Sequence, residues 1–194
     1  LGPAIRARMA PGALVLSILA GAMTATLSKL FPETRIVRLM PNLSAELGLS
    51  PLGLFSNNLS SAEHERLAEF VAPLGTPVWI ENESQMDAVT ALAGSGPAFV
   101  YRFIDAMAKG GEAAGLPADT SARLALATVE GAARLAAASS ASPAALARRV
   151  TSPGGTTAAG LAVLDAGDGL QKLIEETLKA ARDRGRELAN GDKL

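Results

Sequence analysis

The chain has 194 residues, 48% of them hydrophobic and 19% charged, so it is long enough to bury a sizeable core and too apolar to be disordered. Its formal net charge of −1 provides no basic surface for nucleic acid or for an anionic membrane. Cysteine is absent and His64 is the single histidine, which mostly excludes Ser-His and Cys-His catalysis and ordinary zinc sites. We therefore expect no metal, a solvated His64 and a cytoplasmic location. No run of the sequence approaches the ~20 apolar residues that a membrane-spanning helix needs.

The first 80 or so residues alternate between short apolar runs and helical spacing. The predicted strands are 14–19, 35–42, 52–55 and 77–80. We expect the first strand to be buried on both faces, as in a parallel sheet. A helix should follow Met23, and a second should begin at the capping box of Ser60 and Glu63. The apolar face of the second helix would comprise Leu67, Phe70, Val71 and Leu74. This alternation predicts an α/β sheet.

From about Glu83 to the end, helix formers dominate and nothing reads as a strand. Ser84 with Asp87 should cap the first of these helices, which the Gly-Ser-Gly-Pro stretch at 94–97 should kink or split. The later helices are predicted at about 97–114, 120–139, 143–150, 157–166 and 170–189. Alanine-rich helix faces allow close packing, so this region should complete its core in a dimer. A monomeric bundle is the alternative.

The segment VTSPGGTTAAG, which begins at Val150, places two glycines directly before a helix. Gly154 and Gly155 leave backbone N–H groups open, and Thr156 or Thr157 would cap the helix. Free N–H donors at the positive end of a helix dipole, beside several hydroxyls, suit a carboxylate or a phosphate. An ordinary turn between helices is the alternative, and the density of hydroxyls favours the anion site.

Two strand ends are candidates for a dinucleotide site. The ILAGA segment passes from a strand into a helix, and MPN ends the next strand. In a doubly wound sheet the dinucleotide lies at the carboxyl ends of the strands. We therefore expect Leu19, Ala20, Gly21 and Asn42 to contact a cofactor. The glycine-rich break in LAGSGPAFVY either adjoins a ligand or is a plain helical corner.

Three strings in this order, RIVRLMPN, MDAVTALAGSGPAFVYRFIDAM and VTSPGGTTAAGLAVL, resemble the pyrroline-5-carboxylate reductase family. The similarity runs from about Leu14 over almost the whole chain. The family reduces Δ1-pyrroline-5-carboxylate to L-proline with NADPH or NADH, the last step of proline biosynthesis. The resemblance implies that 1–82 is the C-terminal portion of a Rossmann-type dinucleotide-binding domain. It also implies that 83–194 is an all-helical substrate-binding and dimerisation domain, giving a dimer or a higher oligomer.

The resemblance also implies roles for individual residues. Ser152, Gly154 and the amides of 155–157 would hold the substrate carboxylate, and Glu83 would line the same pocket. The hydroxyl of Thr157 would contact the ring nitrogen, as the catalytic group. The imine carbon is already electrophilic, so such an enzyme mainly has to orient it against the nicotinamide.

The sequence departs from the family pattern at its start, where the GxGxxG turn and the cofactor-selectivity loop are absent. Either a further N-terminal portion precedes this sequence, or the product lacks it and does not bind cofactor normally. We favour the first, because a half-sheet would expose parallel strands. Smaller departures are Phe99, Ala138 and Arg148-Arg149.

Two other functions remain open. One is a dehydrogenase of the β-hydroxyacid type, which also combines a Rossmann half with a helical half. That enzyme would need a catalytic lysine on the helical domain, and no such signal occurs near the kinked helix. The other is a non-catalytic dimerisation remnant.

Overall fold

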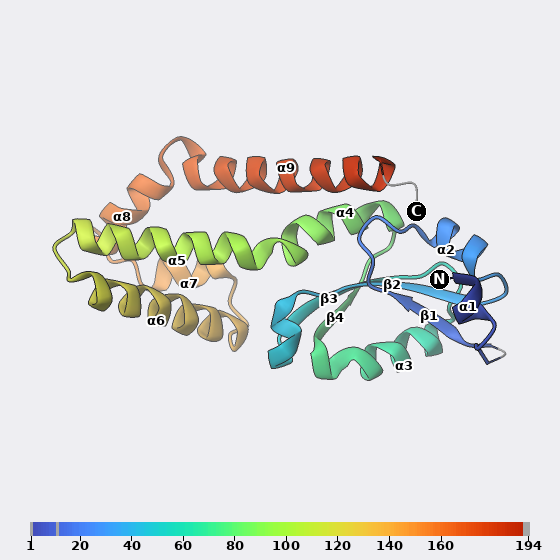
Figure 1. Cartoon of the computed structure of the whole chain (residues 1–194). Helices are drawn as coiled ribbons and strands as arrows, with labels where there is room; N and C mark the ends of the chain where they lie inside the picture. Colours follow the sequence, from blue (N-terminus) through green and yellow to red (C-terminus); the bar gives the residue numbers. More distant parts are fainter. Residues whose placement is uncertain (1, 11, 192–194) are drawn as a thin grey trace. The chain divides into compact units, whose positions relative to one another are not determined.

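The computed structural model describes residues 2–10 and 12–191. It divides into two compact units, each described here by itself. Unit 1 comprises Leu1–Pro97 and Thr177–Leu194, and unit 2 comprises Ala98–Glu176. The predicted domain limits at residues 1 and 194 lie outside the described residues. Figure 1 shows the sheet of unit 1 in blue to green and the helices of unit 2 from yellow-green to orange.

The sheet of unit 1 has four strands in the order β1-β2-β3-β4. The strands are β1 (Leu14–Ser17), β2 (Arg35–Met40), β3 (Ser50–Phe55) and β4 (Gly75–Trp79). All four predicted strands are therefore confirmed. β1 and β2 are parallel, as are β3 and β4, whereas β2 and β3 are antiparallel. Residues 41–49 are too few for the crossover of about a dozen residues that a parallel β2-β3 pair would need.

The helices that lie wholly within unit 1 are short. They are α1 (Gly2–Arg6), α2 (Thr24–Leu30), α3 (Ser61–Val71) and α4 (Met86–Val89), with 3-10 turns η1 (Leu43–Leu47), η2 (Ala72–Leu74) and η3 (Glu83–Gln85). The core cluster of the sheet comprises Val37, Leu39, Leu52, Leu54, Leu67 and Val71. Burial of these side chains is the main stabilisation of unit 1.

Two expectations about burial are wrong. β1 is not buried on both faces, because it is an edge strand of the described sheet and its first three residues are partly exposed. Phe70 is 75% exposed and Leu74 41%. Leu67 and Val71 lie one turn apart and occupy the strip of α3 that meets the sheet, while Phe70 lies about 100° around the helix from Val71.

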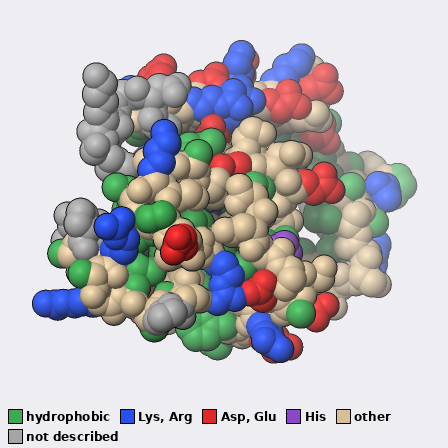
Figure 2. All heavy atoms as spheres, turned by 90° about the vertical axis from the view of Figure 1, so that its right-hand side faces the viewer, with side chains coloured by type: hydrophobic (Ala, Val, Ile, Leu, Met, Phe, Trp, Pro, Cys, Tyr) green, Lys and Arg blue, Asp and Glu red, His purple; other side chains and the backbone are tan. Residues whose placement is uncertain are grey.

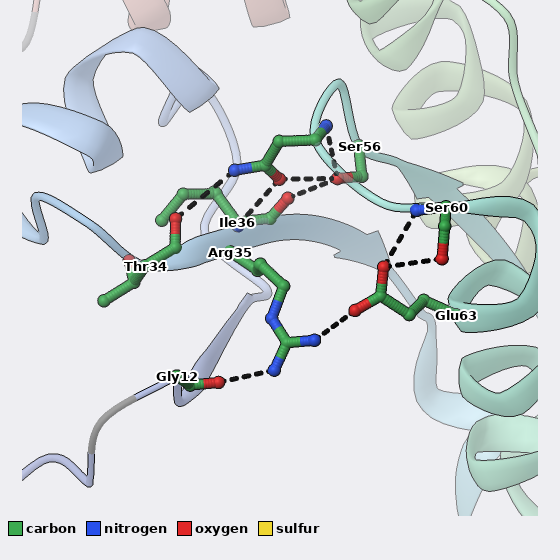
Figure 3. Close-up of polar contacts among 8 residues, drawn as sticks. Gly12, Thr34, Arg35, Ile36, Ser56, Ser60 and Glu63 are labelled. Atoms are coloured by element: carbon green, nitrogen blue, oxygen red, sulfur yellow. Dashed lines mark hydrogen bonds and ion pairs between the residues drawn. The ribbon is translucent and has the colours of Figure 1, made fainter.

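The predicted capping box at the start of α3 is confirmed. The amide and the hydroxyl of Ser60 both donate to the Glu63 carboxylate, at 2.9 and 2.8 Å. Arg35 of β2 donates to the same carboxylate and to the carbonyl of Gly12 (Figure 3). The hydrogen bonds from Ser60, and then that from Arg35, lower the pKa of Glu63 to about 2. This charged group therefore joins the beginnings of β2 and α3.

The expectation that His64 is solvated is wrong. Its ring stacks on Trp79 of β4, with centroids 4.0 Å apart and planes at 17°. Among the described residues, Nε2 of His64 and Nε1 of Trp79 are buried side-chain atoms without a hydrogen-bond partner. His64 lies three residues before Leu67 and so shares the inner side of α3, which brings it onto the sheet.

The helix that follows the sheet begins and breaks within unit 1. The expected cap by Ser84 and Asp87 is wrong, because Asn82 and Gln85 form the capping box, with Gln85 accepting from the amides of 81 and 82 at 3.1 Å. The predicted break is confirmed. α4 passes into a π-helical turn, η4 (Thr90–Gly94), and α5 begins at Gly96. π-helical turns of this kind occur often at functional sites.

Unit 2 is helical, as predicted. Its helices are α5 (Gly96–Ala113), α6 (Ala118–Ala137), α7 (Pro143–Arg149), α8 (Thr156–Leu164) and the turn η5 (Ala166–Asp168), followed by α9 (Gly169–Gly191). α5 begins within unit 1 and α9 ends within it. The hydroxyl of Ser121 donates to the carbonyl of Ala108 at 2.6 Å, and a Cβ on Gly111 would lie 2.1 Å from that hydroxyl. Small residues thus allow α5 and α6 to approach closely.

Candidate functional site

The connection from β1 to α2 forms a tight turn at the carboxyl end of β1. Gly21 adopts a φ of 77°, which favours glycine, and Ala22 is buried at 2% exposure. Leu19 remains 55% exposed. The turn thus presents mostly backbone and small side chains, as expected where a ligand approaches the carboxyl end of a strand.

A cavity of about 360 Å³ adjoins this turn within unit 1. Residues 19–22 form one wall, and Asp87, Thr90 and Ser95 form a second. Ala181, Arg184, Gly185 and Leu188 of α9 complete it. Its size and its apolar lining with a few polar groups suit a small ligand or part of a cofactor. Three predicted cofactor residues, Leu19, Ala20 and Gly21, line this cavity.

Asn42, the fourth predicted cofactor residue, does not line the cavity. Its Oδ1 accepts from the amide of Ser44 at 2.8 Å, and its Nδ2 donates to the carbonyl of Ala93 at 2.8 Å. Its own amide donates to the hydroxyl of Ser50 at 2.9 Å. Asn42 therefore ties the end of β2 to the turn η1 and to the π-helical turn η4.

Glu83 belongs to a network inside unit 1. Its Oε1 accepts from the amide of Thr24 at 2.7 Å and from Nη1 of Arg38 at 3.1 Å, while its Oε2 accepts from the hydroxyl of Thr24 at 2.7 Å. The side chain of Arg38 is 4% exposed and that of Glu83 15%. Charged groups this deeply buried are stable only when paired, and here they hold the first turn of α2.

The TSPGGTT loop lies in unit 2 and leads into α8. Gly154 has a φ of 71°, and Gly155 is the residue that precedes α8. The expectation that Thr156 or Thr157 caps the helix is wrong, because both lie inside its first turn. The helix begins one residue earlier because glycine adopts the extended N-cap conformation readily. The amides of that turn have no partner within the helix itself.

The hydroxyls of the loop fall into two groups. Thr151 donates to the carbonyl of Ala147 at 2.7 Å, which ties it to α7. Ser152, Thr156 and Thr157 are exposed. A Cβ on Gly155 would lie 2.4 Å from Oγ of Ser152, so the missing side chain leaves room for that hydroxyl. The loop thus presents three hydroxyls and the first amides of α8 together, an arrangement that fits a carboxylate.

The predicted substrate residues fall into both units. Ser152, Gly154, Gly155, Thr156 and Thr157 lie together in unit 2, and Glu83 lies in unit 1.

Two site residues were missed by sequence reasoning. Thr24 and Arg38 hold Glu83, and the available signal was an arginine inside the apolar run RIVRLM. Arg148 and Arg149, which depart from the family pattern, end α7 as exposed side chains.

Residues 2–10 and 12–191 offer no sign of a metal centre or of a membrane-spanning helix. No group of three or more His, Asp or Glu side chains there could hold a metal ion. No described helix has both the length and the apolar character needed to cross a membrane. Basic and acidic side chains are intermingled over the face shown in Figure 2. Such a surface differs from the basic stripe that nucleic-acid binding requires.

Known proteins that resemble this chain belong to one enzyme family. The family described as pyrroline-5-carboxylate reductase dimerisation matches residues 83–188. The pyrroline-5-carboxylate reductase of Pseudomonas aeruginosa is 41% identical over 191 residues, covering 97% of this chain and 68% of that relative. The enzyme of Synechocystis is 42% identical over 190 residues, covering 95% of this chain and 70% of the relative.

Solved structures agree with these sequences. A pyrroline-5-carboxylate reductase of Coxiella burnetii superposes with a TM-score of 0.86 at 35% identity, covering 90% of this chain and 65% of that one. The Plasmodium falciparum pyrroline carboxylate reductase, solved with NADP bound, gives a TM-score of 0.77 at 29% identity, covering 91% and 67%. The chain thus spans about two thirds of the length of these relatives.

Proposed function

The chain belongs to the pyrroline-5-carboxylate reductase family, and on that basis we propose that it is an oxidoreductase that reduces Δ1-pyrroline-5-carboxylate to L-proline with NADPH or NADH. Unit 1 contributes part of the dinucleotide-binding domain, and the helical region contributes substrate binding and self-association. The protein acts in proline biosynthesis in the cytoplasm. A dimer or a higher oligomer is its working form, and its partners are a small-molecule substrate and further copies of itself.

The cavity beside residues 19–22 fits the nicotinamide end of the cofactor. It adjoins the carboxyl end of β1, where an α/β sheet binds such ligands, and its wall at Ala20 and Gly21 is of small residues. When bound, the reduced nicotinamide supplies the hydride that adds to the imine carbon. The residues that line this cavity would hold the nicotinamide ring, with Leu19 and Leu188 among its apolar contacts. Asn42 contributes indirectly, through the segments that it ties together.

The TSPGGTT loop holds the substrate. The carboxylate lies at the first amides of α8, where the N–H groups and the positive end of the helix favour an anion. The hydroxyl of Ser152 adds a donor, and Gly154 and Gly155 let the backbone close on a small ligand. The hydroxyl of Thr157 hydrogen-bonds the ring nitrogen of the imine. The substrate would react as its protonated imine, so the ring nitrogen already carries a proton when it binds, and the hydroxyl of Thr157 would accept a hydrogen bond from that N–H. Addition of a hydride to the imine carbon then neutralises the C=N–H⁺ group and yields the secondary amine of proline.

The observation that carries this proposal is the exposure of Ser152, Thr156 and Thr157 around the unpaired amides that begin α8, in a chain of this family. The test is oxidation of NADPH or NADH by the purified protein with Δ1-pyrroline-5-carboxylate, followed by the loss of nicotinamide absorbance, with L-proline identified as product. We expect turnover with the cyclic imine and none with β-hydroxyacids in the reverse direction. Turnover of a β-hydroxyacid, or none of the imine, would overturn the assignment.

A further inference from the structure

A buried charge pair of unit 1 lies behind the proposed cofactor turn. Arg38, on β2, is 3% exposed, and its Nη1 contacts Oε1 of Glu83 at 3.1 Å and the sulfur of Met23 at 3.6 Å. A guanidinium buried among apolar strand residues costs free energy unless a carboxylate compensates its charge. The pair therefore orients Glu83, because Arg38 projects from a strand in the centre of the sheet.

Glu83 in turn holds the first residue of α2. Thr24 is 3% exposed and donates both its amide and its hydroxyl to the two oxygens of Glu83, each at 2.7 Å. Met23, which precedes the helix, forms no capping hydrogen bond with its side chain. A carboxylate 59 residues away in the sequence thus caps α2, and its charge lies at the favourable end of the helix dipole.

These contacts fix one end of the turn that lines the cavity. β1 fixes residue 17 at the other end, and the residues between them include 19–22, which form a wall of the cavity. Both oxygens of Glu83 are engaged by Thr24 and Arg38, so this carboxylate is placed to hold backbone. We propose that Arg38 and Glu83 are positioning residues that set the shape of the nicotinamide-binding turn, an inference that rests on the proposed function.

The variants remove one contact at a time. Arg38→Met removes the charge that holds Glu83, and Thr24→Val removes one hydrogen bond while keeping the shape of the side chain. Thr24→Ser keeps both hydrogen bonds and is the conservative control. Arg35→Met is the matched control, because Arg35 lies on the same strand and pairs with Glu63 away from α2. Thr24→Val keeps the inference testable if Arg38→Met fails to fold.

The first measurement separates cofactor from substrate kinetics. We expect Arg38→Met and Thr24→Val to raise KM for NADPH or NADH and to lower kcat/KM about 10- to 100-fold, since a small misplacement of the nicotinamide is enough for such a loss. KM for the imine should change less than twofold. Thr24→Ser and Arg35→Met should resemble the unmodified protein. A rise in the imine KM alone would show that Glu83 serves the substrate instead, and would overturn the inference.

The second measurement does not depend on activity. Amide hydrogen exchange of the segment 18–27 should accelerate about tenfold in Thr24→Val and Arg38→Met, while the segment 61–71 of α3 keeps its rate. Acceleration over all of unit 1 would indicate a general loss of stability and would contradict a local positioning role. If the unmodified protein reduces no imine, the proposed function fails, yet the exchange result still decides whether Arg38 and Glu83 hold this turn.

Discussion

Asn42 and Ala93 are joined by a hydrogen bond of 2.8 Å from Nδ2 to the carbonyl oxygen, across 51 residues of sequence. The contact connects the end of β2 with the π-helical turn η4. In a turn of this kind the backbone hydrogen bonds span five residues instead of the four of an α-helix. Asn42 also accepts from the amide of Ser44. A single side chain therefore stabilises two irregular segments at the carboxyl end of β2.

Replacing Asn42 with alanine should destabilise the protein by about 1–3 kcal/mol, because two half-buried hydrogen bonds are lost at about 0.5–1.5 kcal/mol each. The free energy of unfolding is measured by urea denaturation. Asn57→Ala is the matched control, since Asn57 is an exposed asparagine of unit 1. Equal stabilities of the two variants would show that neither side-chain hydrogen bond of Asn42 contributes to stability.

The proposed substrate loop is tested by two substitutions in α8 and its N-cap. Thr157→Val keeps the shape and removes the hydroxyl, which should cost about 1.5–3 kcal/mol, or roughly 10- to 150-fold in kcat/KM. Gly155→Val should reduce it further, because its Cβ would lie 2.4 Å from Oγ of Ser152 and would displace that hydroxyl. Cofactor affinity, measured by titration, should barely change.

Gly160→Ala is the control for these variants. Gly160 lies in the same helix, and a Cβ there meets nothing within 4 Å. Its kcat/KM should equal that of the unmodified protein. Unchanged kcat/KM in both Thr157→Val and Gly155→Val would mean that the loop is only a turn.

The capping glutamate of α3 should make stability depend on acid. The pKa of Glu63 is lowered from 4.5 to about 2, so its contribution is fully present above pH 4.5 and is lost as the pH falls to about 2. The difference in free energy of unfolding between the unmodified protein and Glu63→Gln should shrink over that interval. Denaturation at several pH values measures it, with the exposed Glu65→Gln as control. A difference independent of pH would contradict this account.

Self-association should depend on exposed apolar residues of unit 2. Leu124 and Leu135 on α6 are 52% and 62% exposed, and their spacing of 11 residues places them on one side of the helix, as expected of a face that meets another copy. Leu135→Glu should weaken association by about 2 kcal/mol or more, roughly 30-fold in Kd, because a charge would be buried in the contact. Light scattering over a dilution series measures this. Phe70→Glu, at an exposed position of α3 in unit 1, should leave the mass unchanged. An unchanged mass for Leu135→Glu would exclude this face.

The positions of the helices and strands could be predicted because each depends on a local sequence pattern. The four apolar runs correspond to the four strands, and the Ser60-Glu63 capping box and the glycine-rich break at 94–97 lie where expected. Their partners could not be predicted in the same way. The antiparallel β2-β3 pair follows from the short connection, and Phe70 is exposed because the sheet accepts only one strip of α3.

The site was predictable where it consists of continuous segments and not where it consists of long-range contacts. Leu19, Ala20 and Gly21 line a cavity because strand ends gather at one edge of a sheet. The link from Arg38 through Glu83 to Thr24 joins three elements, and no spacing in a single sequence indicates such a contact. The roles proposed for Ser152 to Thr157 come from the family and from the geometry of one loop, and they stay predictions.

The stack of His64 on Trp79 gives the protein an intrinsic fluorescent probe of the contact between α3 and the sheet. The chain has one tryptophan and one histidine, and these two rings lie against each other where α3 covers β4. The fluorescence of Trp79 therefore reports on this one contact of unit 1 without any added label. Separation of α3 from the sheet would change the wavelength and the intensity of the emission. Rearrangements confined to unit 2, which contains no tryptophan, would leave the signal unaltered. Fluorescence and circular dichroism, recorded on the same unfolding curve, would thus distinguish loss of the sheet from loss of the helices.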